Sequence, residues 1–62
     1  MEAKKSLILE AAHNVFIDEG IEGFSMSKIG KKAKISTSLI FHYFENKDEL
    51  ILELVEYTLY KL

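Results

Sequence analysis

The apolar residues of this chain recur at the spacing of buried helix faces. In residues 3–19 they form a single stripe with the period of about 3.6 residues that characterises an α-helix. The stripe consists of Leu7, Ile8, Ala11, Ala12, Val15 and Phe16. Gly20 follows, and glycine readily adopts the left-handed conformation that ends a helix. We therefore predict a helix over residues 3–19 and a turn over residues 21–24.

The middle of the chain predicts two short helices. Ser25 or Ser27 can cap the first, because a serine hydroxyl accepts a hydrogen bond from a free N–H at a helix start. One face of this helix would carry Met26, Ile29, Gly30 and Ala33. Residues 34–35 make a tight connection, and Ser36 can cap a helix that ends near Phe44. Two short helices joined by a turn of a few residues are typical of a helix-turn-helix motif.

A fourth helix is predicted over residues 47–62. Asn46 can cap it, and Glu49, three residues later, can complete a capping box. Its apolar stripe consists of Leu50, Ile51, Leu54, Val55, Leu59 and Leu62. The predicted fold is therefore all-α: a three-helix, homeodomain-like helix-turn-helix domain over residues 1–46, then a connecting helix over residues 47–62.

Helical geometry divides the third predicted helix into two faces. The core side carries Ser36, Leu39, Ile40, Tyr43 and Phe44, and the opposite side carries Thr37, Ser38, Phe41 and His42. In a DNA major groove, Thr37 and Ser38 would bind base edges or phosphates, and Phe41 would pack on thymine methyls or sugar. His42 could donate to a phosphate. Alternatively, Phe41 is a core residue beneath a loop and the hydroxyls merely start the helix. Periodicity alone does not choose between these interpretations.

The distribution of charge favours the nucleic-acid interpretation. The chain of 62 residues has a formal net charge of -2, which by itself argues against a DNA partner. However, residues 24–44 contain four lysines and no acid, whereas nine of the ten acids lie in residues 10–56 outside that window. The lysines are Lys28, Lys31, Lys32 and Lys34. We expect this basic block to contact double-stranded DNA, with Lys28 among the phosphate contacts.

Other classes of protein find little support. The chain contains no cysteine, so we expect no disulfide and no thiolate metal site, and we expect no metal or other cofactor. An enzyme would have to combine Ser36 or Ser38 with His42, yet no third group is available to orient the histidine. No apolar run is long enough to span a membrane and no signal peptide is evident. We therefore expect a cytoplasmic protein that is not an enzyme.

Residues 24–50 read FSMSKIGKKAKISTSLIFHYFENKDEL. This segment closely resembles the signature of the TetR/AcrR family of bacterial transcriptional regulators, and with residues 8–20 the resemblance covers most of the chain. The resemblance implies phosphate contacts from Ser25 or Ser27, Tyr43 and Lys47. It also implies base or sugar contacts from the outward residues of the third helix, which are Thr37, Ser38, Phe41 and His42.

Four residues depart from the family pattern. Lys34 replaces a turn glycine, so a residue with a side chain must accept the backbone geometry of the turn. Ser38 replaces a second frequent glycine. Leu39 stands where a phosphate-binding threonine is common, and Phe41 stands where tyrosine is common. The resemblance therefore supports the fold, whereas the operator sequence cannot be predicted from it.

Proteins of this family are homodimers, usually repressors, that bind a palindromic operator and release it when a ligand enters a larger C-terminal domain. This chain ends inside the fourth helix, so the resemblance identifies it as the N-terminal part of such a regulator. The apolar stripe of residues 50–62 would then be partly unpartnered, which predicts weak self-association. A rival hypothesis is a helical interaction module that pairs with a full-length regulator without binding DNA.

Overall fold

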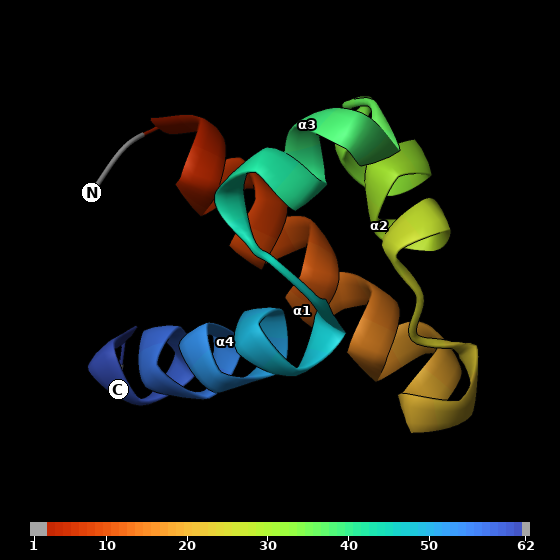
Figure 1. Cartoon of the computed structure of the whole chain (residues 1–62). Coiled ribbons are helices and arrows are strands. Elements are labelled where there is room, and N and C mark those ends of the chain that lie inside the picture. Colours follow the sequence, from red (N-terminus) through yellow and green to blue (C-terminus); the bar gives the residue numbers. More distant parts are fainter. Residues whose placement is uncertain (1–2, 62) are drawn as a thin grey trace.

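The computed structural model describes the backbone of residues 3–61 and the side chains of residues 3–60. These residues form four α-helices, which are α1 (Ala3–Gly23), α2 (Met26–Ala33), α3 (Thr37–Tyr43) and α4 (Lys47–Lys61). Helix α1 passes between α4 on one side and the α2–α3 pair on the other (Figure 1). The all-α fold predicted from the sequence is confirmed. No helix in the described part of the chain is both long and apolar enough to cross a membrane.

A single hydrophobic core joins all four helices. Its buried members are Ile8, Leu9, Ala11, Ala12, Val15, Phe24, Met26, Ile29, Ile40, Phe44, Leu50 and Leu54. Helix α1 supplies five of them, because it is the helix that the others pack against. The first two turns of α4 supply Leu50 and Leu54, so the start of this helix is built into the same core as α1, α2 and α3.

Polar side chains cap the starts of α2, α3 and α4 as the sequence predicts. The Ser25 hydroxyl accepts from the Lys28 N–H at 3.2 Å, so Ser25, and not Ser27, is the cap of α2. The Ser36 hydroxyl accepts from the Leu39 N–H at 3.2 Å. The Asn46 side-chain oxygen accepts from the Glu49 N–H at 2.9 Å. These bonds satisfy N–H groups that have no partner within a helix, and each is worth about 1 kcal/mol.

The end of the first helix differs from the prediction. Gly20 has φ 72° and leaves the helical conformation, as expected of a glycine that ends a helix. The chain then makes one further helical turn through Gly23, where a turn without helix was predicted. A hydrogen bond from the Phe24 N–H to the Ile21 carbonyl, at 3.3 Å, closes this turn. Gly20 thus places a kink near the end of α1.

The buried face of α1 is rotated from the predicted stripe. Leu7 is 52% exposed and Phe16 is 45% exposed, whereas Leu9, which lay outside the predicted stripe, is fully buried. The reason is that α1 has neighbours on two sides, so its buried arc is set by the positions of α2 and α4 as well as by its own periodicity. Phe16 is still partly covered, because its ring packs edge-on against the Phe24 ring. The two ring centroids lie 6.2 Å apart.

The predicted stripe of α4 is only half buried. Leu50 and Leu54 are buried and Ile51 packs against the core, but Val55 and Leu59 are exposed. The apolar arc of this helix is wider than the surface that α1 covers. Leu62, the last residue of the predicted stripe, lies outside the described residues.

Replacing Phe44 should unfold or nearly unfold the domain. Its side chain is fully buried, and Phe→Ala at such a site costs about 3–5 kcal/mol. A chain of this length has a total stability of roughly 3–9 kcal/mol. We expect Phe44→Ala to lower the urea midpoint of helical circular dichroism sharply. Phe41→Ala, on the exposed face of the same segment, is the matched control and should leave the midpoint nearly unchanged. Equal midpoints for the two variants would contradict the proposed core.

Candidate nucleic-acid interface

Helix α3 presents a mixed polar and aromatic face to solvent. Thr37, Ser38 and His42 are exposed and Phe41 is 46% exposed, while Ile40 on the opposite side is fully buried. The predicted outer face is therefore confirmed. The predicted inner face is confirmed only in part, because Ser36 is exposed as the cap of the helix and Leu39 and Tyr43 are half-buried. The exposure of Phe41 contradicts the alternative in which this ring is a core residue beneath a loop.

The inner side of α3 holds the helix rigidly against the core. Ile40 and Phe44 are both fully buried, and the Phe44 N–H donates to the Ile40 carbonyl at 2.9 Å where the helix ends. Tyr43 is half-buried, and its ring packs edge-on against the His42 ring, with the two ring centroids 5.7 Å apart. These contacts fix the rotation of α3, so the exposed face cannot turn inward without breaking the core.

The turn between α2 and α3 contains the only non-glycine residue with positive φ in the described chain. Lys34 has φ 59° and ψ 42°, the left-handed conformation, and its N–H donates to the carbonyls of Gly30 and Lys31. The Ile35 N–H also donates to the Gly30 carbonyl, at 2.9 Å. A β-carbon on Gly30 would lie 2.8 Å from the Ile35 carbonyl oxygen, so the turn passes directly over this glycine. The lysine that replaces the usual turn glycine at position 34 therefore carries a conformational cost.

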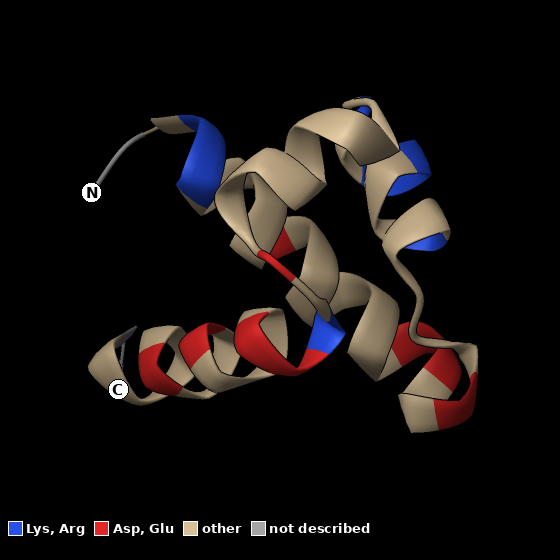
Figure 2. Cartoon of the chain, in the orientation of Figure 1, with Lys and Arg blue, Asp and Glu red and all other residues tan. Residues whose placement is uncertain are grey.

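Ion pairs divide the four lysines of the basic block into two pairs. Lys28 forms an ion pair with Glu19, and Lys32 forms one with Asp18 at 2.9 Å. Both acids lie on α1 just before the kink. Lys31 and Lys34 are exposed, and no acid lies within ion-pair distance of either among the described side chains. Figure 2 shows lysines along α2 and at the turn, and acids gathered at the end of α1 and along α4.

Lys31 and Lys34 border an open hollow beside the start of α3, which we call the turn recess. Its volume is about 450 Å³. It is lined by Ser27, Gly30, Lys31, Lys34, Ile35, Ser36 and Thr37. Two lysines and three hydroxyl-bearing residues therefore line an open hollow next to the exposed face of α3, and no acidic residue is among the described residues that line it. This composition suits an anion.

The other predicted phosphate contacts lie at the start of α2, on α3 and at the start of α4. Ser25 is half-buried and acts as the cap of α2, whereas Ser27 is exposed and lines the turn recess. Tyr43 is half-buried on α3. Lys47 is exposed in the first turn of α4. The sequence analysis included Lys31 and Lys34 in the basic block expected to contact DNA, but it named only Lys28 of that block as a phosphate contact.

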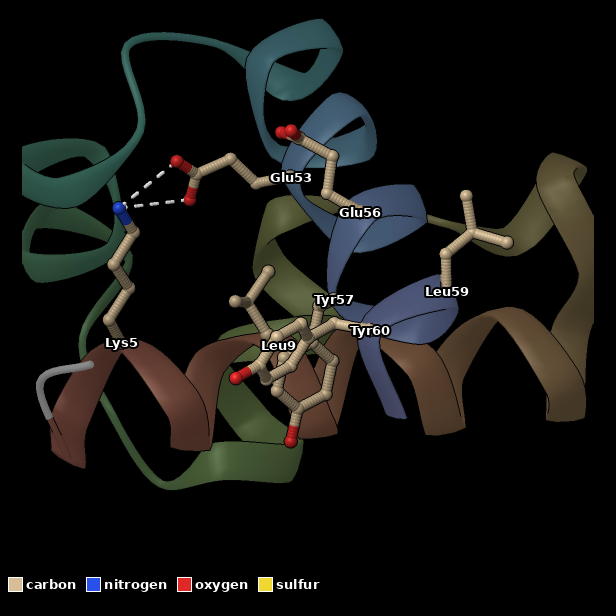
Figure 3. Close-up of a pocket in the computed structure, with 7 residues that line it drawn as sticks. All are labelled: Lys5, Leu9, Glu53, Glu56, Tyr57, Leu59 and Tyr60. Carbon is tan, nitrogen blue, oxygen red and sulfur yellow. Dashed lines mark hydrogen bonds and ion pairs between the residues drawn. The ribbon is translucent and has the colours of Figure 1, made fainter. Parts of the chain in front are cut away.

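A larger groove lies between α1 and α4, on a different surface. Its volume is about 730 Å³, and Lys5, Leu9, Glu53, Glu56, Tyr57, Leu59 and Tyr60 line it (Figure 3). Lys5 is already paired with Glu53 at 2.9 Å, so the unpaired charge of the groove is acidic. Such a surface repels a phosphate backbone. Over the described residues, no three His, Cys, Asp or Glu side chains gather as a metal site would require.

Two short helices joined by a tight turn, packed on a longer helix, with the outer face of the second helix exposed, define a helix-turn-helix domain. Comparison with known proteins identifies its kind. Residues 8–54 match the family described as bacterial regulatory proteins, tetR family. The chain belongs to this family, as the sequence resemblance predicts.

Named relatives agree with this assignment. The chain is 35% identical over 57 residues to the uncharacterized HTH-type transcriptional regulator YuxN of Bacillus subtilis, a match that covers 92% of this chain and 20% of that protein. It is 38% identical over 50 residues to the regulator PksA of the same organism, covering 81% of this chain and 24% of PksA. It is 32% identical over 59 residues to the regulator BetI of Rhizobium meliloti, covering 95% of this chain and 29% of BetI.

The matched segment spans about a fifth to less than a third of the length of these relatives. No solved structure matches the chain. The comparisons therefore support a general class of function, which is DNA-binding regulation, because each of these relatives is named as an HTH-type transcriptional regulator.

The strain at Lys34 yields a testable prediction about stability. Lys34→Gly should stabilise the domain by about 1 kcal/mol, because glycine adopts the left-handed conformation without steric cost. The matched control is Lys31→Gly, which places glycine inside α2 and should destabilise the domain by about 1 kcal/mol. Urea unfolding measures both changes. A loss of stability in Lys34→Gly would show that the turn is not strained.

Proposed function

We propose that the chain is the DNA-binding domain of a TetR-type transcriptional regulator that binds a palindromic operator and acts as a repressor. Helix α3 would lie in the major groove, as the second helix of a helix-turn-helix motif does. The observation that supports this most directly is the outward face of α3, which is exposed beside two lysines that form no ion pair with any acid among the described side chains.

The residues on that face would read the operator. Thr37 and Ser38, in the first turn of α3, can donate to or accept from base edges or phosphates. Phe41 would pack against thymine methyl groups or deoxyribose, since an aromatic ring exposed to solvent gains by covering an apolar group. His42 is in the last turn and would contact sugar or phosphate at the edge of the groove.

Residues on the neighbouring elements would hold the DNA backbone. Ser25 and Ser27 lie at the start of α2, Tyr43 at the end of α3 and Lys47 at the start of α4. Lys28 is proposed as a further phosphate contact, and a phosphate would have to compete with Glu19 for its ammonium group. Phosphate contacts of this kind set register and affinity and do not themselves read sequence.

The size of the domain agrees with one operator half-site. Its longest extent is 29 Å, measured over Cα atoms, and successive half-sites of a palindrome lie about 34 Å apart along B-DNA. We propose that the complete regulator is a homodimer that a small molecule releases from DNA through a further domain, and that it acts in the bacterial cytoplasm.

The main alternative is an interaction module that pairs with a full-length regulator and does not bind DNA. Such a module would not need unpaired lysines beside an exposed hydroxyl-rich helix face, which is why we favour DNA binding. The two hypotheses differ in one measurement, the binding of the chain to duplex DNA at low salt.

Lys47→Ala should weaken binding to every DNA sequence to the same degree. Loss of one phosphate contact should reduce the slope of log affinity against log salt by about 0.9. Fluorescence anisotropy with a labelled duplex over a salt series measures this slope. Lys32→Ala, which removes a lysine already paired with Asp18, is the matched control and should change the slope less. An unchanged slope in Lys47→Ala would remove Lys47 from the interface.

Phe41→Ala should change the preferred DNA sequence. Loss of an apolar contact with a base typically costs about 1–3 kcal/mol at the position that it reads. Selection of bound fragments from a random pool, with the chain covalently dimerised to compensate for the weak affinity of one half-site, reveals the preference. Lys47→Ala is the control here and should select the same sequence as the unmodified chain. An unchanged preference in Phe41→Ala would show that this ring does not read DNA.

A further inference from the structure

The four lysines of the basic block are not equivalent, and the difference indicates which of them are available to a ligand. Glu19 and Asp18 hold the ammonium groups of Lys28 and Lys32 toward α1. A competing anion must first displace a carboxylate from either lysine. Lys31 has no such partner among the described side chains, and neither has Lys34. The unpaired positive charge of the block therefore lies at the turn between α2 and α3.

The same two lysines line the turn recess together with residues that carry neutral hydroxyl donors. Ser27 and Thr37 line it from α2 and α3, and both are exposed. Thr37 also belongs to the reading face of α3, so the recess and that face are contiguous. An anion in the recess would thus lie where a DNA strand passes beside the major groove occupied by α3.

The backbone at Lys34 gives an independent reason to assign a role to its side chain. A residue with a β-carbon in the left-handed conformation costs about 1 kcal/mol compared with glycine. The side chain makes no ion pair within the described part of the chain that would offset this cost. Conformational cost of this kind is often found at binding sites.

We infer that Lys31 and Lys34 each bind a backbone phosphate of DNA at the turn recess, with Ser27 and Thr37 as neighbouring hydroxyl donors. This inference rests on the proposed function and goes beyond it, because it assigns two lysines of the turn to the phosphate backbone. Lys34 is then a phosphate ligand at a position where a glycine could supply none.

The test measures binding of a short fluorescent duplex of mixed sequence over a salt series from about 50 to 200 mM. The variants are Lys31→Gln and Lys34→Gln, with Lys32→Gln as the matched control in the same helix. Each of the first two should lower the salt slope by about 0.9 and weaken binding roughly eightfold at about 0.1 M salt, as expected for one lost phosphate contact. Lys32→Gln should stay close to the unmodified chain.

Lys34→Gly separates binding from folding. It should raise the urea midpoint and yet weaken DNA binding as much as Lys34→Gln, a combination that damage to the fold cannot produce. If the unmodified chain fails to bind the duplex at low salt, the proposed function itself is wrong. If the unmodified chain binds, and Lys31→Gln and Lys34→Gln behave like Lys32→Gln, DNA binding stands and the assignment of the turn lysines is overturned.

Discussion

The burial of Ile40 and Phe44 is the constraint on which the rest of this structure depends. Both side chains are fully buried in the core built on α1, and they lie four residues apart, which is about one helical turn. Their burial fixes the rotation of α3 about its own axis. Once that rotation is fixed, helical geometry requires Ser38 and His42 to point away from the core, and it leaves Phe41 at the side of the helix, where its ring is exposed. The exposure of the surface that we propose reads DNA is therefore a consequence of core packing.

Charge is organised around that surface in a way that the net charge of -2 does not reveal. The acids at the end of α1 pair with Lys28 and Lys32 on the flank of α2, where they join the two helices. Exposed pairs of this kind contribute little to stability, typically less than about 1 kcal/mol. Their larger effect is on the basic block of residues 24–44, where the described lysines without an ion pair are the two that line the turn recess. A chain with an excess of acids can in this way present a basic surface to DNA.

Local features of the sequence predicted most of the fold. The features that the sequence did not predict depend on how the helices pack against one another. The caps at Ser25, Ser36 and Asn46 depend on a few neighbouring residues, and so does the conformation of Gly20. The faces of α3 followed from periodicity because this short helix has a core on one side and solvent on the other. Periodicity failed for α1, which has neighbours on two sides, and the exposure of Leu7 and Phe16 shows this. The pairing of Lys28 with Glu19 could not be predicted either, because it depends on how α2 packs across α1.

Lys34 shows how stability and binding can be opposed within a small domain. A chain of 62 residues buries only about 60% of the surface that its unfolded state exposes, so it has little stability in excess. A left-handed lysine lowers that stability by about 1 kcal/mol at a position where glycine would not. The same residue adds a positive charge to the turn recess, next to the face of α3 that we propose reads DNA. One phosphate contact alters DNA affinity by a comparable amount of free energy at moderate salt. The conformational cost and the gain in binding are therefore of similar size, which explains how a strained lysine can be tolerated in a turn that would be more stable with glycine.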